Sequence, residues 1–559
     1  VVALPEILYL MINSTTPPTY LAVLPFKETG QQQVRIGDGL AKSLRDSLAT
    51  VPSLKVLPYT SSGEAKFANT SPDVLMKAMS SSWILSGEIE HRGDEVEVRY
   101  KLYGNKRQQP FEGSVKGSRR NYAELRGNLI GTVTQWLKSA PPNPANAVSF
   151  KDEEKYLTAI TLLQGDLNEE TIDPPIKLLE ELAQTEPQPA RVQAMLARAY
   201  IRKASLVDTD AREWTDKAFK ASEEALRLDA NLPEVKVTRG MVLAFLEERA
   251  QAISILKEAW QASPGDSTAA LELARTFEDD NQHDEAERIY KEVIANWPGY
   301  WLGYNELGAF YFERRRYNEA LTEWLRVLEI NRESSSGWEN VSAAYFEIGN
   351  YPQSEQTLRT LLETRNDLSL NEQVKIHSGI GVSLFFQQRY LQALESYKTA
   401  LNLKPDAQNA FLFANLSDAL RQVTGEENAT YDAYSKAIEI RRNSKLSETG
   451  RARLAETFAK RSILAVTTQA QSASDRKAAV EIVSLLSNRK PDQNPLPADA
   501  LYSIIKTSYI LGDLPTAINY VKLALAAKQN LTTLDNDPEL IGLRQNPDYQ
   551  QSVETFRNR

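Results

Sequence analysis

The sequence contains no cysteine and only three histidines in 559 residues. Without cysteine the chain has no disulfides, no thiolate ligands for a metal ion and no cysteine nucleophile. The histidines are His91, His283 and His377, and none has a second histidine at the spacing that a zinc site needs. All three are expected at the surface.

Other catalytic motifs are missing as well. There is no Gly-x-Ser-x-Gly sequence, and "GSVKGS" at 113–118 is too short for a phosphate-binding loop. Gly37-Asp38-Gly39 looks like the start of a dinucleotide loop, but Lys42 stands where the third glycine belongs. These glycines are expected to let the backbone turn and Asp38 cap a helix. We predict no enzyme activity, cofactor or metal, the alternative being an enzyme with an unrecognised site.

The first twelve residues, Val1–Ile12, are apolar except for Glu6. They are too few to cross a bilayer, which takes about 20 residues. They also lack an initiator methionine and a basic flank, so they are not a secretory signal as they stand. We interpret residues 1–19 as the exit end of a transmembrane helix and a polar spacer. The alternative is a buried strand or a docking helix of the first domain.

Charge is divided unequally along the chain. Residues 1–145 have a net charge of +4 and the remainder of −13, which gives −9 overall. Binding to a nucleic-acid backbone needs a positive field, so we expect no nucleic acid to be bound by this region. The alternative is that the negative charge only keeps a long surface soluble.

A 34-residue period runs through the middle of the chain. Small residues recur where two helices would approach closely, and bulky residues recur where the gap must be filled. The series in register are Ala252, Ala286, Ala320 and Ser354; Gly240, Ala274, Gly308 and Ser342; and Leu243, Phe277, Tyr311 and Tyr345.

This period resembles the tetratricopeptide repeat (TPR), whose helical pairs stack because no single pair can bury its apolar face. In the clearest unit, Gly308 and Ala320 are expected where its two helices cross, with Tyr311 and Trp324 filling the gap to the next unit. We predict an all-α TPR superhelical solenoid of about eight to nine units over 151–530. A Pro-rich linker, 139–150, precedes it, and a carboxy-terminal cap, 531–559, follows it.

Residues 20–138 have a different pattern, in which strands alternate with helices. Together they predict a small α/β domain. The expected strands are Tyr20–Phe26, Leu54–Tyr59, the two arms of a hairpin that turns at Arg92–Glu95, and one further strand. The expected helices are 36–48, one that is capped by Ser71 with Pro72 in its first turn, and roughly Asn121–Leu137.

Four segments of this domain, "LAVLPF", "GDGLAKSL", "VPSLKVLPYTSS" and "WILSGEIEHRGDEVEVRYKLY", are similar in turn to the TolB-like amino-terminal domain of bacterial signalling proteins. After Phe67 the chain reads "FANTSPD" where that family has a longer basic turn, so a ligand bound there in relatives is not implied here. With the repeats, the chain resembles the non-catalytic part of bacterial membrane-anchored regulators.

This resemblance implies an extracytoplasmic sensor or scaffold region of a membrane-anchored Ser/Thr protein kinase in the bacterial envelope. One alternative is a free-standing TPR assembly adaptor in secretion or envelope biogenesis. Another is the sensor region of a winged-helix transcriptional regulator or of a cyclase. A cytoplasmic location and a homodimer are also compatible with the sequence.

The groove of the solenoid is the predicted protein-binding site. In a TPR unit, residues near positions five, six, nine, twelve and thirteen of the first helix face the concave side. Here they are acidic at one end, with Arg275 the only base, and aromatic at the other, which suits a basic or apolar peptide or an internal segment. The alternative is that the phenylalanines pack between adjacent helices. The predicted groove residues are Glu272, Glu278, Asp279, Glu306, Phe312, Glu313, Glu339, Phe346, Glu347, Phe385, Phe386, Phe413, Leu416 and Leu420.

Overall fold

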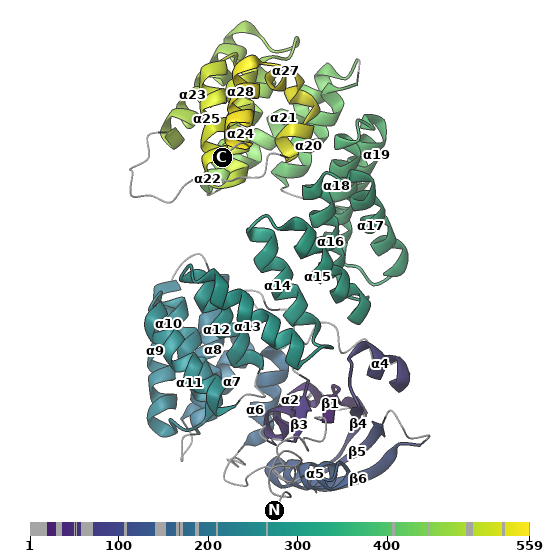
Figure 1. The fold of residues 1–559 in the computed structure, drawn as a ribbon. Helices are drawn as coiled ribbons and strands as arrows, with labels where there is room; N and C mark the ends of the chain where they lie inside the picture. Colours follow the sequence, from purple (N-terminus) through teal and green to yellow (C-terminus); the bar gives the residue numbers. More distant parts are fainter. Residues whose placement is uncertain are drawn as a thin grey trace, which may run out of the picture. The chain divides into compact units, whose positions relative to one another are not determined.

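The structure is a computed structural model, and its chain divides into two compact units (Figure 1). The first unit comprises residues 1–307 and 326–334, and the second comprises 308–325 and 335–559. The predicted membrane-exit segment and most of the predicted linker lie outside the described residues. The structure describes residues 19–29, 36–49, 51, 53–57, 71–104, 109–139, 152–163, 167, 171–184, 189–207, 211–263, 267–404, 409–423, 425–444, 446–487, 496–527 and 532–557.

A sheet of six strands forms the centre of the amino-terminal domain in the described ranges. β1 pairs in parallel with β3 and β4, and β4, β5 and β6 follow as an antiparallel meander. The predicted α/β fold is confirmed. One strand, β2, was not predicted: it pairs with β4, and its three residues are too few to show a pattern in the sequence. The strands are β1 (Thr19–Val23), β2 (Lys27–Thr29), β3 (Leu54–Val56), β4 (Trp83–Arg92), β5 (Glu95–Gly104) and β6 (Phe111–Ser118).

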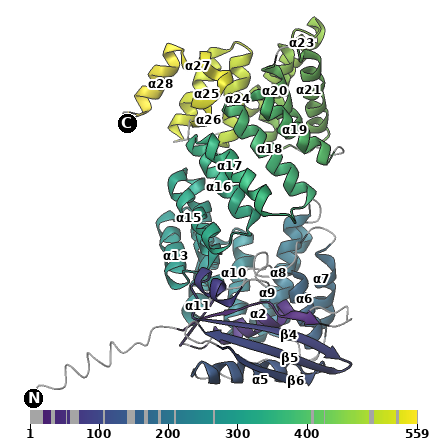
Figure 2. The same ribbon diagram turned by 90° about the vertical axis from the view of Figure 1, so that its right-hand side faces the viewer.

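Helices pack on both faces of this sheet. On one face α2 (Gly37–Leu48) and α5 (Tyr122–Trp136) join the inward side chains of β4 and β5 in one core, and α5 runs along β6 (Figure 2). On the other face α4 (Pro72–Ala78) packs against Ile84. Ser71 occupies the N-cap position of α4 but lacks the predicted side-chain hydrogen bond.

The unpredicted strand β2 changes two local expectations through Glu28. The N-cap of α2 is Ile36, and Asp38 lies in the first turn instead of capping it. The amide of Gly37 donates to Glu28 Oε1 at 2.8 Å, so a carboxylate from β2 satisfies the helix start. His91 lies in β4 with a side chain only 3% exposed, 3.8 Å from Glu28 Oε2, so the surface position predicted for it is wrong.

The helix that opens the helical region, α6 (Glu153–Leu163), packs on the amino-terminal domain. Leu157 is fully buried in the core formed by the sheet, α2 and α5. A Cβ atom on Gly39 of α2 would lie 2.3 Å from the Leu157 carbonyl oxygen, so the close approach of α2 and α6 requires glycine there. Arg126 of α5 and Glu153 form a buried ion pair. The core of this domain therefore extends beyond residue 138.

Twenty helices, α6 to α25, follow one another as ten successive pairs in the part of the chain that the structure describes. This confirms an all-helical solenoid, with α22–α23 as a pair that the 34-residue register did not indicate. None of the described helices combines the length and the apolar character of a membrane span. The remaining bounds are α7 (Asp173–Ala183), α8 (Ala190–Leu206), α9 (Ala211–Leu228), α10 (Pro233–Phe245), α11 (Arg249–Ala262), α12 (Ser267–Asp279), α13 (His283–Asn296), α14 (Trp301–Glu313), α15 (Tyr317–Ile330), α16 (Ser335–Ile348), α17 (Tyr351–Thr364), α18 (Leu370–Phe386), α19 (Tyr390–Leu403), α20 (Ala410–Arg421), α21 (Glu427–Arg442), α22 (Glu448–Ser462), α23 (Gln469–Ser487), α24 (Ala498–Ile510) and α25 (Leu514–Ala526).

The small residues of the 34-residue register lie at helix crossings. Ala252, Ala286 and Ala320 are fully buried. A Cβ atom on Gly308 would lie 2.4 Å from Trp324 Nε1, so the indole ring fills the space that this glycine leaves within its own repeat. A small and a large side chain are therefore matched inside a repeat.

After α25 the chain forms α26 (Thr532–Asn536), the 3₁₀ helix η3 (Pro538–Leu540), α27 (Ile541–Arg544) and α28 (Pro547–Arg557). α28 packs against α25, and Tyr549 and Val553 are buried in a shared core. Leu534 and Leu540 are buried in the same core. They fix both ends of residues 535–539, which lie inside the second unit.

Candidate protein-binding groove

Three of the four predicted acidic residues of the first unit are paired within the protein. Arg275 donates to Glu272 Oε1 at 2.6 Å and to Glu306 Oε2 of the following repeat at 2.9 Å. Burial alone would lower the pKa of Arg275, but these two carboxylates raise it above its usual range. Glu278 accepts a hydrogen bond from the hydroxyl of Tyr290 at 3.1 Å. These carboxylates are therefore occupied in joining helices and repeats.

The predicted aromatic residues of the second unit form clusters along its first helices. Phe312 contacts Tyr317 and Trp324, with ring centroids 5.0 and 5.2 Å apart. Phe346 and Phe386, from successive repeats, approach to 5.0 Å edge to face. These contacts connect neighbouring helices, yet several of the rings remain half-exposed.

The other predicted residues differ in exposure. Phe385 and Leu416 are buried, whereas Phe413 is half-buried and Glu313 is exposed. Glu339 and Glu347 are half-buried, Asp279 of the first unit is exposed, and Leu420 is buried. Burial raises the pKa of Glu339. The predicted set therefore combines core positions with positions that a ligand can reach.

A cavity of about 300 Å³ lies among the first helices of the later repeats, in the second unit. Phe346, Phe385 and Phe386 form part of its wall, so three of the predicted groove residues meet there. The remaining lining residues are Val382, Tyr397, Phe411, Ala414, Asn415, Asp418, Tyr434, Arg441, Arg453, Glu456, Thr457, Lys460, Tyr502, Ser503 and Lys506. The cavity thus has an aromatic side and a charged side.

The charged side is a buried cluster of Asp418, Glu456, Lys460 and Lys506, which we call the charged cluster. Lys460 Nζ lies 2.6 Å from Asp418 Oδ2 and 2.8 Å from Glu456 Oε1. Lys506 Nζ lies 3.5 Å from Glu456 Oε1. Both lysine side chains are at most 5% exposed, so these ion pairs are shielded from water.

Burial and ion pairing oppose each other in the charged cluster. Burial alone would raise the pKa of Glu456, but Lys460 and Lys506 outweigh it and hold the pKa well below its usual range. Burial lowers the pKa of Lys460 despite its carboxylate partners. Burial would lower the pKa of Lys506 as well, but Asp537 and Glu456 raise it. Asp537, from the carboxy-terminal segment, opposes the effect of burial on the pKa of Lys506 more strongly than any other group.

The sequence analysis did not predict the charged cluster, although its residues occupy helix positions that face the concave side of a TPR unit. Asp418, Glu456 and Lys506 are each the ninth residue of α20, α22 and α24, and Lys460 is the thirteenth of α22. These positions face the concave side of a TPR unit. The 34-residue register is lost after residue 404, so the positions could not be assigned from the period alone.

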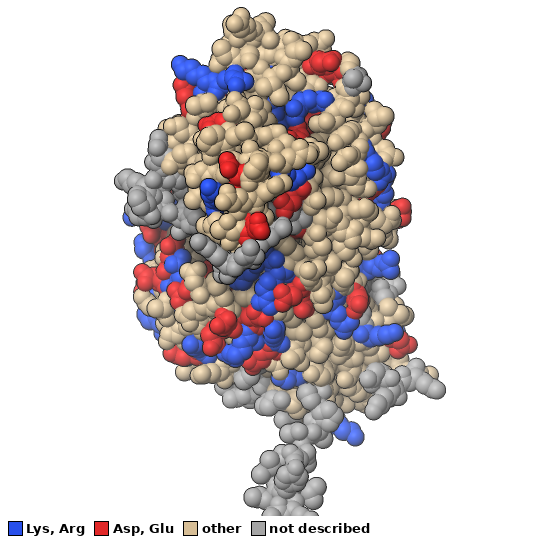
Figure 3. All heavy atoms as spheres, turned by 45° about the horizontal axis from the view of Figure 1, so that its top comes forward, with Lys and Arg blue, Asp and Glu red and all other residues tan. Residues whose placement is uncertain are grey.

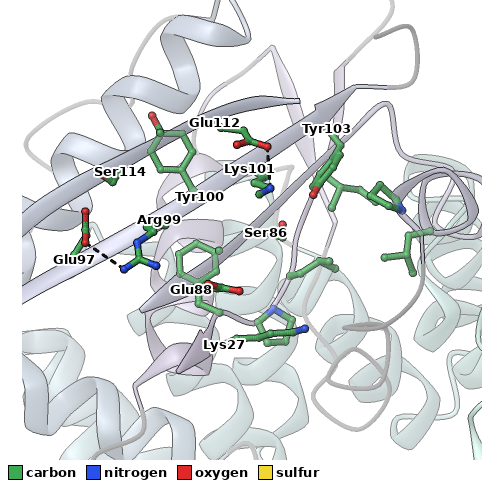
Figure 4. A pocket seen from close by; sticks show the side chains of 18 of the residues that line it. Lys27, Ser86, Glu88, Glu97, Arg99, Tyr100, Lys101, Tyr103, Glu112 and Ser114 are labelled. Atoms are coloured by element: carbon green, nitrogen blue, oxygen red, sulfur yellow. Dashed lines mark ion pairs between the residues drawn. The ribbon is translucent and has the colours of Figure 1, made fainter. Parts of the chain in front are cut away.

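A second concavity, of about 920 Å³, lies on the sheet of the amino-terminal domain, where Arg99, Lys101 and Tyr103 are among its lining side chains (Figure 4). Its charged side chains pair within and between strands: Arg99 lies 3.5 Å from Glu97 of the same strand, and Lys101 of β5 lies 2.9 Å from Glu112 of β6. The segment after Phe67, where the chain departs from the TolB-like pattern, lies outside the described residues up to 70. The described lining therefore identifies no ligand for this concavity.

Surface charges of both signs are interspersed on the face shown in Figure 3. Among the described residues, several charged side chains pair three or four residues apart on one helix, such as Arg288 with Glu285 and Lys291 with Glu287. Such pairs make an exposed helix soluble without creating a field of one sign.

Comparison with known protein families identifies the repeats directly. Residues 247–296 and residues 303–335 each match a tetratricopeptide repeat family model. These matches coincide with α11–α13 and with α14–α15, where the small-residue register is clearest.

Curated relatives share only part of their length with this chain. Superkiller protein 3 of Schizosaccharomyces pombe is 22% identical over 28% of this chain and 12% of its own length. The protein O-mannosyl-transferase TMTC1 of Homo sapiens is 23% identical over 35% of this chain and 21% of its own length. The matched regions thus span about an eighth and a fifth of these relatives.

Solved structures resemble the chain at low identity. A human IFIT1 dimer with PPP-AAAA is 14% identical, with a TM-score of 0.37, over 65% of this chain and 77% of that chain. The Pseudomonas aeruginosa protein pilF is 17% identical, with a TM-score of 0.31, over 38% of this chain and 93% of that chain. On the two repeat matches and the paired helices around them, this chain carries tetratricopeptide repeats in a helical solenoid that follows a small α/β domain.

Proposed function

We propose that the chain is a non-catalytic scaffold that binds a protein or peptide segment in the cavity of the second unit. The observation that carries this proposal is the aromatic wall of Phe346, Phe385 and Phe386 facing the charged cluster across one cavity. Half-exposed rings supply apolar contact area, and buried charges supply orientation, which is the combination that peptide grooves use.

The partner's charge is the point at which the proposal departs from the sequence-based expectation. A basic or apolar peptide was expected, and the basic option rested on the acidic concave positions of α12 and α14. Glu272 and Glu306 are already paired with Arg275, whereas the cavity of the second unit is lined by Arg441, Arg453 and the two lysines of the charged cluster. The proposed ligand is therefore a protein segment with apolar or aromatic side chains, and no nucleic acid is proposed.

The finer proposal is that this region is the extracytoplasmic sensor of a membrane-anchored Ser/Thr kinase. Its support is the resemblance of residues 20–138 to TolB-like domains together with the repeats. Protease treatment of intact cells tests it, since an extracytoplasmic region is cleaved while a cytoplasmic control protein survives. Protection of the region until the cells are lysed would contradict this location and favour a cytoplasmic adaptor.

Peptide selection against the whole protein tests the binding function. Peptides selected from a displayed random library are expected to bind the wild-type chain and to lose at least about tenfold in affinity with Phe411→Ser. Phe411 lines the cavity and is 50% exposed, with Arg453 over its ring at 4.1 Å.

Leu391→Ser is the matched control, because Leu391 is a 67% exposed apolar residue of α19 that does not line this cavity. It should leave the affinity unchanged. Equal affinity of wild type and Phe411→Ser for every selected peptide would refute the cavity as the binding site.

A further inference from the structure

The carboxy-terminal segment, residues 532–540, enters the second unit and reaches the charged cluster. Lys506 Nζ lies 2.8 Å from Asp537 Oδ2 and 2.6 Å from Glu539 Oε2. Lys460 Nζ lies 3.1 Å from Glu539 Oε2. Arg421 of α20 also pairs with Glu539. One short segment therefore contacts α20, α22 and α24, the first helices of three successive pairs.

The contact is buried and directional. Asp537 is fully buried, and the side chain of Glu539 is 4% exposed. The hydroxyl of Tyr502 donates to Asp537 Oδ2, and the amide of Glu539 donates to Asp537 Oδ1 at 2.8 Å. Both carboxylates are thus held by charge-assisted hydrogen bonds, which are the stronger kind.

The charged side chains that α20, α22 and α24 contribute to this site have a positive excess. The facing helices contribute three cations, Arg421, Lys460 and Lys506, but only two carboxylates, Asp418 and Glu456. The two carboxylates of the segment reverse this excess. Without them, buried cations would remain without full compensation, which is costly in a site shielded from water.

A cavity remains next to the carboxy-terminal segment. The cavity of about 300 Å³ is lined by the same lysines and Tyr502, and it continues to the phenylalanine wall. Arg441 and Arg453, which also line it, add positive charge, although each has a partner: Arg441 donates to Thr457 Oγ1 at 2.6 Å, and Arg453 lies 2.6 Å from Asp499. The surface around the segment is therefore cationic and aromatic.

We infer that residues 535–539 are an internal ligand of the groove, and that the external partner is an acidic peptide whose carboxylates take the places of Asp537 and Glu539. This inference rests on the proposed peptide-binding function and specifies its ligand. The acidic segment of a partner would compete with the chain's own segment for Lys460, Lys506 and Arg421. Binding is then coupled to release of the carboxy-terminal segment.

A peptide with the sequence of residues 532–541, TTLDNDPELI, is the direct probe. Labelled with a fluorophore, it should bind the Asp537→Asn/Glu539→Gln chain at least about tenfold more tightly than wild type. An analogue with Asn and Gln in place of these two acids should bind at least about tenfold more weakly. Adding Lys460→Met/Lys506→Met to that chain should return binding of the acidic peptide to the wild-type level.

Asp548→Asn is the matched control, since Asp548 is an exposed acid of α28 in the same carboxy-terminal region. It should bind the peptide as wild type does. Equal binding of the acidic peptide to wild type and to Asp537→Asn/Glu539→Gln would overturn the inference. So would binding of the neutral analogue to the variant chain as tight as that of the acidic peptide.

A second readout needs no substitution in the cluster. The chain lacks cysteine, so Asn536→Cys, at an exposed position of the segment, accepts a single environment-sensitive dye. Excess acidic peptide should change the dye's emission as the segment is released, and the neutral analogue should not. No change with the acidic peptide would overturn the inference. If library-selected peptides still bound in that case, the proposed function would stand without this inference. The effect of Phe411→Ser on the affinity for those peptides tests the proposed function separately.

Discussion

Lys506 Nζ lies 2.6 Å from Glu539 Oε2, and this contact joins the helix α24 to a segment 33 residues later in the chain. Both side chains are at most 5% exposed. Since Lys506 also lies 2.8 Å from Asp537 Oδ2 and 3.5 Å from Glu456 Oε1, it is the centre of a buried network. Removing a single member leaves buried charges without partners, and this cost is the basis of the stability predictions for the second unit.

Lys506→Met is expected to lower the free energy of unfolding of the second unit by about 3–5 kcal/mol, the usual cost of removing one partner from a buried ion pair. Urea unfolding followed by circular dichroism measures it. Lys398→Met is the control, because Lys398 is 56% exposed and its partner Glu395 is 3.9 Å away. Its cost should stay below about 1 kcal/mol. Equal costs for the two variants would show that the network is not stabilising.

The pH dependence of stability should report Glu456. Its folded-state pKa lies below the ordinary value of 4.5, because Lys460 and Lys506 outweigh burial. A depressed carboxyl pKa contributes stability that is fully present above the unfolded-state pKa and is lost as pH falls through the folded-state value. The free energy of unfolding should therefore fall below about pH 4.5, with this group contributing up to about 1.4 kcal/mol per pH unit.

Glu456→Gln isolates that contribution. The variant should be less stable at neutral pH and should lose less stability on acidification than wild type. Chemical unfolding at a series of pH values between neutral and pH 3 makes the comparison. Parallel pH profiles for the two proteins would mean that Glu456 does not titrate with a depressed pKa.

Gly39→Ala should destabilise the amino-terminal domain and loosen α6 from it. The added Cβ would lie 2.3 Å from the Leu157 carbonyl oxygen, and backbone cannot move aside as a side chain can. Gly131→Ala is the matched control, since a Cβ atom added to this exposed glycine of α5 would meet nothing within 4 Å. It should stabilise by about 0.5–1 kcal/mol, the helix-propensity difference. Thermal melting measures both, and a stabilising Gly39→Ala would contradict the packing of α2 on α6.

The amino-terminal domain should need α6 to complete its core. A fragment of residues 19–163 is expected to unfold cooperatively at a higher temperature than one of residues 19–138. Only the longer fragment contains Leu157, which is fully buried, and Glu153, which pairs with Arg126. Differential scanning calorimetry compares them. Identical melting temperatures would place the domain boundary where the sequence pattern put it, at residue 138.

The sequence predicts best where one local rule decides the structure. Ala252, Ala286 and Ala320 are fully buried as the 34-residue register requires, because a helix crossing accepts only a small side chain. The hairpin of β4 and β5 likewise turns at Gly93 and Asp94, as the alternation on both sides indicates. Periodicity and turn chemistry are both read within a few residues, so no distant contact is needed to find them.

The sequence predicts poorly where a distant segment supplies the missing group. Glu28, from a strand of three residues, satisfies the start of α2 in place of the expected Asp38. Asp537 and Glu539 complete a cluster on α22 and α24, and no pattern within those helices indicates that two acids arrive from beyond α25. The positions of Lys460 and Lys506 could have been found by continuing the helix positions past residue 404. Their partners Asp537 and Glu539 could not have been found in this way.

Hydrogen exchange of residues 532–540 tests the central claim most directly. If this segment occupies the groove, its amides exchange slowly in the wild-type chain, including that of Glu539, which donates to Asp537 Oδ1, and that of Leu540, which donates to the Asp537 carbonyl oxygen. Lys460→Met/Lys506→Met should then speed their exchange, while amides of α28 stay protected by their packing on α25. Exchange of the segment at the rate of an unfolded chain in the wild-type protein would contradict the account.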